Sequence, residues 1–470
     1  MLRKLLGFAR RIAAPQPQAA IPQAAMPASH GIDKQIIPRD QHSVSRKQIS
    51  SAALKVLYRL NASGYQAYLV GGGVRDLLLG GHPKDFDIAT DAHPEIVDGL
   101  FSNARLIGRR FKLVHVRFGR EIIEVATFRA SADLDDEHLH EETGRILRDN
   151  TYGNQDEDAA RRDFSVNALY YDISDFSIHA YANGLEDLNN KVLRLIGDPA
   201  VRYREDPVRM LRAARFAAKL GFTVDKAASD AIYELGELLA GVPSARLFDE
   251  ALKLFMSGYG QASWKQLEHF NLLQYLLAEG PQAPTGLKLA LLALASTDSR
   301  VAADKPVTPA FIYAAFLWEA FSKAHRKMLA TDVAPQDAFF AAADSTVARQ
   351  LMTTSIPKRF TLPMKEVWGL QSRLERHSKR NVKSCLFHPR FRAAYDFLLL
   401  REAAGEDTEG AGQWWTDYIS SDEGKMLHDE AQEKHAQQRN ERREASGGRD
   451  DGDGRKRPRR RRGRKPQNNG

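Results

Sequence analysis

Two aspartates that stand two residues apart, Asp85 and Asp87, have a spacing that could do chemistry. They lie in the segment KDFDIAT, which has the alternation of a β-strand, and alternate side chains of a strand point to the same face. Two neighbouring carboxylates repel each other unless a cation lies between them, and Mg²⁺ prefers oxygen ligands of this kind. Pairs of Mg²⁺ ions serve phosphoryl transfer by activating the attacking hydroxyl and holding the departing phosphate. The pair therefore indicates a metal site, although a D-x-D on its own is commonly a solvated strand end.

A glycine turn stands directly before these aspartates, in LVGGGVRDLLLG. Gly71, Gly72 and Gly73 would let the backbone approach a phosphate closely, because a Cβ at such a position would collide with it. Arg75 follows and can reach the same phosphates as a forked donor. The order of strand, glycine turn, helix, strand and paired acids is more specific than any of its parts. It lacks the Gly-Lys-Ser/Thr of a Walker A loop, and a dinucleotide fingerprint would lack the paired acids.

A two-metal site normally includes a third carboxylate close to the first two, and the residues offer two candidates. Glu124 lies in EIIEVATFR, a segment with strand character, in phase with Ile122 and Ala126, which leaves its face open. Asp163 lies in RRDF, where two arginines precede the acid, as a site for triphosphate and metal requires. Taken alone, RRDF also fits a surface ion pair on a helix. The pattern by itself does not choose between the two carboxylates.

The elements that must position these residues follow from periodicity. An apolar-periodic helix runs from Ser45 to about Ala62 and stops at Gly64, and YQAYLV is the strand that leads into the glycines. FKLVHVRFG and EIIEVATFR have the alternation of a hairpin. Together they predict a small mixed sheet with packed helices over roughly residues 50–180. After Asp198 strands nearly vanish, and helical periodicity continues to about residue 405.

The positive charge of the chain is confined to one end. Residues 455–465, RKRPRRRRGRK, contain nine Lys or Arg and no acid, so that the rest of the chain, whose total is +8, is at about −1. A block of like charges repels itself and stays disordered until a polyanion neutralises it. This tail predicts nucleic-acid binding, with a solubilising segment as the alternative. Trp414 and Trp415 could stack on RNA bases, with a packed helix end as the alternative.

Composition also bears on where the protein works. The single cysteine, Cys385, excludes an intramolecular disulfide framework and a Cys-rich metal site, which favours a reducing cytoplasm. No run of about 18 uncharged apolar residues occurs, so no spanning helix is expected. Basic residues interrupt the apolar part of MLRKLLGFARRIA, which argues against an export signal. This N-terminus is either an amphipathic helix at the surface of the inner membrane or a frayed terminus.

The motifs resemble those of class II nucleotidyltransferases of the polymerase-β superfamily, the group that holds tRNA CCA-adding enzymes and bacterial poly(A) polymerases. Besides LVGGGVRDLLLG…KDFDIAT, three further segments agree with the family in order: RRDFSVNALYYD (161–172), NGLEDL (183–188) and EDPVRMLRAARFAAKLGF (205–222). The resemblance covers roughly residues 50–225. It implies a fold of the α+β class, with a polymerase-β-like head on a small mixed sheet, followed by an all-α body and a disordered basic tail.

The resemblance also implies roles for particular residues. Arg162 would contact the nucleotide, and Asp163 would join Asp85 and Asp87 in the catalytic group. The family therefore favours Asp163 as the third carboxylate, while Glu124 remains a rival. Two Mg²⁺ ions and ATP as the substrate are expected with this set.

A second set of residues concerns the base. Asp206 and Arg209 are three residues apart, which on a helix is the spacing of an ordinary salt bridge. In the resembling enzymes this pair meets the edge of the incoming base, so that the protein selects the nucleotide instead of a template strand. Glu205 and Arg212 are expected to support the pair.

Within the family, LIGRRFKLVHVRFG (106–119) and FHPRFRAAYDFLLLR (387–401) resemble bacterial poly(A) polymerases. The basic tail also fits a protein that holds many unrelated RNA 3′ ends, since phosphate contacts carry no sequence information. The implied activity is template-independent transfer of AMP from ATP to RNA 3′-hydroxyls, with release of pyrophosphate and promotion of RNA decay. The alternative is a CCA-adding enzyme acting on tRNA. We expect a monomer, with RNA-decay proteins as candidate partners.

These interpretations divide the chain into five successive parts: a low-complexity extension (1–44), the catalytic head (45–180), a helical neck that recognises the base (181–260), a helical RNA-binding body (261–430) and a disordered Arg/Lys-rich tail (431–470).

Overall fold

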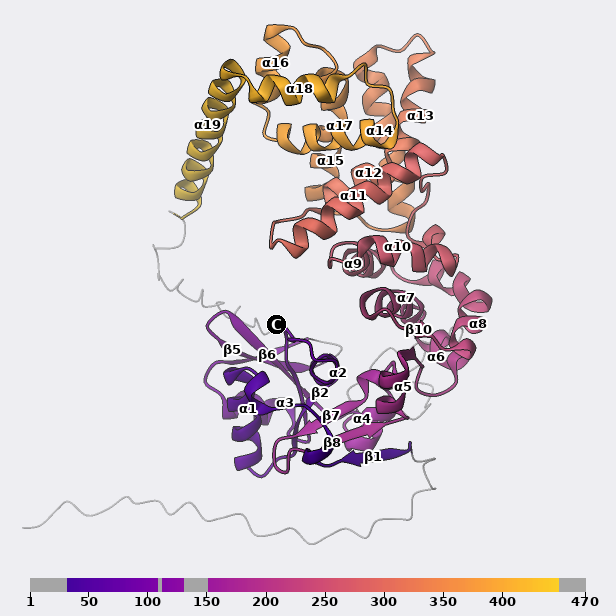
Figure 1. Cartoon of the computed structure of the whole chain (residues 1–470), viewed down its shortest axis with the longest axis vertical. Coiled ribbons are helices and arrows are strands. Elements are labelled where there is room, and N and C mark those ends of the chain that lie inside the picture. Colours follow the sequence, from indigo (N-terminus) through magenta and orange to yellow (C-terminus); the bar gives the residue numbers. More distant parts are fainter. Residues whose placement is uncertain (1–31, 109–111, 131–150, 448–470) are drawn as a thin grey trace, which may run out of the picture. The chain divides into compact units, whose positions relative to one another are not determined.

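The computed structural model describes residues 32–108, 112–130 and 151–447, and its chain forms two compact units (Figure 1). The first unit, which we call the head, contains the described residues up to 130 together with 151–162 and 167–185. The second, which we call the helical unit, contains 163–166 and the chain from 186 onward. Residues 109–111 of the segment LIGRRFKLVHVRFG and the basic segment 455–465 lie outside the described residues.

An eight-stranded mixed sheet forms the centre of the head, with the strand order β1-β8-β7-β2-β3-β6-β5-β4. Neighbouring strands are antiparallel except β3 and β6, which run parallel. The mixed sheet that the sequence predicts is therefore confirmed. The strands are β1 Lys34–Ile37, β2 Ala67–Val70, β3 Asp87–Thr90, β4 Ala104–Ile107, β5 Leu113–Phe118, β6 Glu121–Thr127, β7 Leu169–Asp172 and β8 Ile178–Tyr181.

Helices pack on this sheet because alternate strand residues are apolar. Val114 and Val116 of β5, and Ile123 and Val125 of β6, are almost completely buried. Helix α1 contacts β2, β3 and β6, and α3 contacts β4, β5 and β6, as Figure 1 shows for the purple part of the chain. The four helices of the head are α1 Ser51–Ala62, α2 Gly72–Leu78, α3 Pro94–Leu100 and α4 Gln155–Ala160.

The helical unit confirms the predicted change from strands to helices. Its two-residue strands, β9 Val192–Leu193 and β10 Thr223–Val224, pair in parallel. Its core holds large aromatic side chains, among them the fully buried Trp264, Trp368 and Trp415. The helices are α6 Pro199–Glu205, α7 Val208–Leu220, α8 Lys226–Leu235, α9 Ser244–Phe255, α10 Gly260–His269, α11 Pro284–Ala302, α12 Pro309–Phe316, α13 Trp318–Leu329, α14 Pro335–Thr353, α15 Lys358–Leu374, α16 Lys379–Leu386, α17 Phe391–Ala404, α18 Ala411–Ser420 and α19 Asp422–Gly447, while α5 Gly184–Asn190 lies where the chain passes from one unit to the other.

Two predicted boundaries differ from the structure. Residues 1–44 were expected to form a low-complexity extension throughout, but Lys34–Ile37 forms the edge strand β1, paired with β8. Residues 431–470 were expected to be structureless, but α19 continues to Gly447. Its sequence contains no proline and is rich in Ala, Glu, Gln, Lys and Arg, which are strong helix formers. No helix in the described part of the chain is long and apolar enough to span a membrane.

Candidate active site

The parallel pairing of β3 with β6 brings two acidic residues together in the head. Asp87 and Glu124 are direct partners in this register. Phe86 and Ile88 are buried, whereas Asp85 and Asp87 are exposed, so the predicted alternation holds. The sheet thus carries Asp87 and Glu124 side by side on its exposed face, which determines the face of Glu124 that the sequence left open. Asp85 lies two residues before β3, close enough for its charge to act on Asp87.

The electrostatics of this group shows that its negative charge is only partly compensated. Crowding by protein atoms raises the pKa of Asp87 to about 6, and the charges of Glu124 and Asp85 act in the same direction. The Arg162 guanidinium opposes this rise without cancelling it. A cation placed here would stabilise the ionised form of Asp87, which is the property expected of a metal site.

A histidine that the sequence interpretation did not select also reaches this group. Nε2 of His115 on β5 lies 3.3 Å from Oε1 of Glu124, and the two residues are partners across the antiparallel β5–β6 pair. Strand phase alone places His115 on the exposed face, but its pairing with Glu124 depends on the hairpin register. Among the described residues, no three His, Cys, Asp or Glu side chains already converge as a complete metal cage.

The glycine turn and Arg162 meet beside the acids of the head. Gly71 precedes α2 with a φ of +67° and a ψ of −129°, a conformation that only glycine adopts readily. A Cβ at this position would lie 3.3 Å from Nη1 of Arg162 and 3.7 Å from the carbonyl oxygen of Asn167. Gly71 therefore lets the backbone lie directly against the Arg162 guanidinium.

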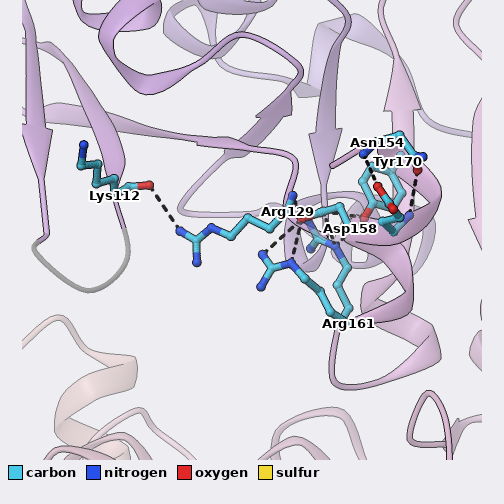
Figure 2. A network of polar contacts seen from close by, with 8 residues as sticks. Lys112, Arg129, Asn154, Asp158, Arg161 and Tyr170 are labelled. Carbon is cyan, nitrogen blue, oxygen red and sulfur yellow. Dashed lines mark hydrogen bonds and ion pairs between the residues drawn. The ribbon is translucent and has the colours of Figure 1, made fainter. Parts of the chain in front are cut away.

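Arg162 is held by Asp158, a residue of α4 that the sequence interpretation missed. Figure 2 shows Asp158 together with Arg161 and Tyr170. Nη2 of Arg162 donates to Asp158 Oδ2 at 2.9 Å, and the Tyr170 hydroxyl donates to the same oxygen at 2.8 Å. Arg161 Nη2 donates to the other carboxylate oxygen at 3.2 Å. Burial alone would raise the pKa of Asp158, but Arg162 and Arg161 outweigh it and hold the pKa below its ordinary value. The i, i+4 spacing of Asp158 and Arg162 was the available signal.

Arg75 has different partners from the phosphate that the sequence suggests. Its side chain is 2% exposed. Nε donates to Asp76 Oδ1 at 2.8 Å, and Nη1 donates to Asn167 Oδ1 at 2.6 Å. In this structure Arg75 braces α2 against the Asn167 segment and does not present its guanidinium to solvent.

Asp163 belongs to the helical unit, and its carboxylate is engaged there. Arg212 Nε donates to Asp163 Oδ2 at 2.8 Å, and the backbone N–H of Phe164 donates to Oδ1 at 2.8 Å. In the neighbouring NGLEDL motif, the buried Asp187 accepts from the Ser165 hydroxyl at 2.6 Å and pairs with Arg194. A metal-binding role for Asp163 therefore stays a prediction, while its partner in the structure is an arginine.

The predicted base-reading pair differs in one respect from the expectation. Asp206 and Arg209 do not share a helix, because α6 ends at Glu205 and Asp206 is its extended C-cap. Pro207 explains this, since a residue before proline disfavours the helical conformation. Asp206 Oδ1 instead accepts from the N–H of Val208 at 3.2 Å, at the start of α7.

Both members of this pair are held by other charged groups. Arg209 Nη1 donates to Glu205 Oε2 at 2.8 Å, in keeping with the supporting role expected of Glu205. Arg246 on α9 donates to Asp206 Oδ2 at 2.7 Å, a contact between residues 40 positions apart that no local pattern could reveal. Arg212, which was expected to support the pair, binds Asp163.

Three family models match the chain in order. Residues 67–194 match the Poly A polymerase head domain, and residues 221–283 match the probable RNA and SrmB-binding site of polymerase A. Residues 331–465 match the polymerase A arginine-rich C-terminus.

Similar proteins cover most of the chain. Poly(A) polymerase I of Salmonella typhimurium is 43% identical over 436 residues, which is 90% of this chain and 92% of that protein. The same enzyme of Haemophilus influenzae is 41% identical over 82% of this chain and 88% of its own length. The CCA-adding enzyme of Lactobacillus helveticus is 37% identical, but over 45% of this chain and 52% of that protein.

Solved structures of similar fold include CCA-adding enzymes. That of Bacillus stearothermophilus in complex with CTP has a TM-score of 0.53 at 24% identity, covering 78% of this chain and 82% of that one. That of Thermotoga maritima complexed with tRNA has a TM-score of 0.55 at 19% identity, covering 82% and 86%. At such identities the likeness establishes the fold alone.

Proposed function

The chain belongs to the family of bacterial poly(A) polymerases, and we propose on this basis that it lengthens RNA 3′ ends with AMP taken from ATP, without a template. The observation that carries the chemistry is the pairing of Asp87 with Glu124 across the parallel strands β3 and β6. It gathers the carboxylates at the start of β3, next to the glycine turn that follows β2. The reaction joins the RNA 3′-oxygen to the α-phosphorus of ATP and breaks the bond to the departing pyrophosphate.

Asp85, Asp87 and Glu124 are the residues that would hold Mg²⁺. Their carboxylate oxygens suit this ion, and the raised pKa of Asp87 marks a place where an added positive charge is favourable. Bound Mg²⁺ would neutralise negative charge on the phosphates and make the RNA 3′-hydroxyl more acidic. We propose Glu124 as the third carboxylate, because it pairs in register with Asp87, whereas Asp163 binds Arg212.

The triphosphate is the group that the glycine turn and Arg162 would bind. Gly71 and Gly72 present no side chain, so a phosphate oxygen can approach their backbone. Arg162 lies against Gly71 with its guanidinium oriented by Asp158 and Tyr170. Because this arrangement exists before the nucleotide binds, less conformational freedom is lost on binding.

Asp206 and Arg209 would read the edge of the adenine base. An acceptor and a donor held by Arg246 and Glu205 can form a fixed hydrogen-bond pattern, and a base with the opposite pattern would leave a polar group unpaired. RNA would be contacted through the helical unit, where residues 221–283 match a probable RNA-binding site. The Arg/Lys-rich tail would add salt-sensitive affinity. Promotion of RNA decay, RNA-decay proteins as partners and a monomeric state are part of the same proposal.

Primer extension with each of the four nucleoside triphosphates tests this function. We expect long tails of A alone on an unstructured RNA oligonucleotide. Addition of C and A restricted to tRNA would overturn the proposal in favour of a CCA-adding enzyme. The Asp87→Asn variant is the control for contaminating activity, and we expect it to incorporate no AMP.

A further inference from the structure

The surface next to α16 carries three aromatic rings in one continuous stack. The His377 and Trp414 rings are 4.0 Å apart between centroids with an interplanar angle of 6°. The Trp414 and Tyr418 rings are 5.0 Å apart with an angle of 7°. His377 lies in the loop between α15 and α16, and the other two lie one turn apart on α18, so two separate segments build what we call the aromatic ladder: His377, Trp414 and Tyr418.

The ladder is not part of the core that holds these helices. Trp415, the neighbour of Trp414, is fully buried and donates from Nε1 to the carbonyl oxygen of Leu374 at 2.8 Å. It anchors α18 to the end of α15. His377 is exposed, and Trp414 and Tyr418 are partly exposed. Of the two tryptophans, Trp415 is thus a packed helix end, and Trp414 belongs to a surface stack.

Positive charge surrounds the exposed end of the ladder. Arg376, Lys379 and Arg380 flank His377 and are all exposed. Three acids lie nearby: Glu375 pairs with Arg401 at 3.2 Å, Asp417 accepts from Gln413 Nε2 at 2.9 Å, and the charge of Glu423 acts on Tyr418 at the other end of the ladder. The His377 end of the ladder therefore combines an exposed aromatic ring with a local excess of cations.

We propose that the aromatic ladder and the cations Arg376, Lys379 and Arg380 form a binding site for single-stranded RNA. His377 and Tyr418 cover the two faces of Trp414, so an unpaired base would continue the stack at its exposed His377 end, while the neighbouring cations bind the phosphates. This combination tolerates any sequence. A protein partner fits this surface less well, because charged residues are depleted at the centre of protein interfaces. The site lies in the region that matches the arginine-rich C-terminus and outside residues 221–283, which match the probable RNA-binding site. The choice of RNA as the polyanion rests on the proposed function.

Binding of a labelled A20 RNA oligonucleotide to the full chain, measured by fluorescence anisotropy at several salt concentrations, tests the site. We expect Trp414→Leu and, separately, His377→Ala to weaken binding about tenfold, which corresponds to about 1.4 kcal/mol. The triple variant Arg376→Gln, Lys379→Gln and Arg380→Gln should make the negative slope of log K against log salt less steep by about 2, since each single-strand phosphate contact contributes about 0.7. His377 is in an exposed loop, so its variant does not depend on the folding of α18.

A matched control removes three other exposed cations, Lys323, Arg326 and Lys327 of α13, and should change the affinity and the salt slope much less. KM for ATP should be the same in all variants. RNA affinity in Trp414→Leu and His377→Ala equal to that of the unmodified chain would overturn the proposal, including the case in which the surface serves a protein partner. If the unmodified chain binds RNA through this ladder but adds no AMP, the proposed function fails and this inference stands.

Discussion

Replacement of Asp158 by asparagine should both destabilise the head and weaken ATP binding. The carboxylate is buried and accepts hydrogen bonds from Arg162, Arg161 and Tyr170. Removing one partner of a buried ion pair typically costs about 3–5 kcal/mol. Arg161 and Arg162 keep some access to solvent, with side chains 24% and 22% exposed, so we expect the lower end, about 3 kcal/mol.

The functional consequence follows from the position of Arg162. Asp158 and Tyr170 orient its guanidinium against Gly71. Without the carboxylate the guanidinium is held less firmly, so the triphosphate must order it on binding. We expect KM for ATP to rise about tenfold or more in Asp158→Asn.

Two probes measure the stability of the head and of the helical unit separately. All five tryptophans of the chain lie at residue 264 or beyond, in the helical unit, so tryptophan fluorescence follows the unfolding of that unit. Hydrogen exchange of peptides from β3 and β6 reports the opening free energy of the head. Asp158→Asn should lower this opening free energy while leaving the fluorescence transition in place. Asp98→Asn, at an exposed position of α3, is the matched control and should change it by less than about 0.5 kcal/mol.

The pH dependence of the stability difference between the unmodified chain and Asp158→Asn gives a further check. The pKa of Asp158 lies below its ordinary value in the folded head, so its contribution is present above the unfolded pKa of about 4 and is lost as the pH falls below it. The difference between the unmodified chain and Asp158→Asn should therefore shrink in acid. A cost below about 1 kcal/mol at pH 7 together with an unchanged KM for ATP would refute the reasoning.

Three other substitutions test the remaining parts of the site. The pKa of Asp87 is raised to about 6, so its charged form opposes folding as the pH rises through 6. Asp87→Asn should therefore stabilise the head by up to about 1 kcal/mol at pH 8 in EDTA. The same variant should abolish AMP incorporation. Thermal unfolding with and without Mg²⁺ measures the change in stability, and only the unmodified chain should gain stability from the ion. Gly71→Ala would force a Cβ against Arg162 at a backbone conformation with a φ of +67°, costing about 1–3 kcal/mol and raising KM for ATP in steady-state kinetics. Arg246→Gln releases Asp206 without removing a buried group, and should lower the ratio of kcat/KM for ATP over CTP several-fold with little change in thermal stability. An unchanged ratio would show that Arg246 does not position Asp206 for base selection.

Local patterns were sufficient for much of the head. Strand alternation correctly placed Asp85 and Asp87 on one face, and the glycines at the turn were identified by the conformation that they permit. The extended conformation of Asp206 could also have been inferred, because Pro207 follows it. The edge strand Lys34–Ile37 was missed because four residues next to a low-complexity segment carry almost no periodic signal.

Contacts between distant segments were beyond such patterns. Asn167 receives a hydrogen bond from Arg75 across 92 positions, and Arg246 reaches Asp206 across 40. Neither spacing has a local period, so only the tertiary fold determines which arginine meets which acceptor. The partner of Glu124 likewise depended on the order of the strands, since β3 and β6 are neighbours in the sheet but not in the chain.

The acids of the four motifs can be sorted by how their charge is balanced, which the sequence alone does not reveal. Four of them each bind an arginine within the helical unit and thereby fix the chain: Asp163 with Arg212, Asp187 with Arg194, Glu205 with Arg209 and Asp206 with Arg246. Asp87 behaves differently, because crowding by protein atoms and neighbouring carboxylates raise its pKa more than Arg162 lowers it. A carboxylate that already pairs with an arginine gains little from an added cation, whereas a carboxylate whose charge is not compensated is stabilised by one. The same residue type therefore serves architecture in one place and metal binding in another, and the balance of charge around each acid distinguishes the two.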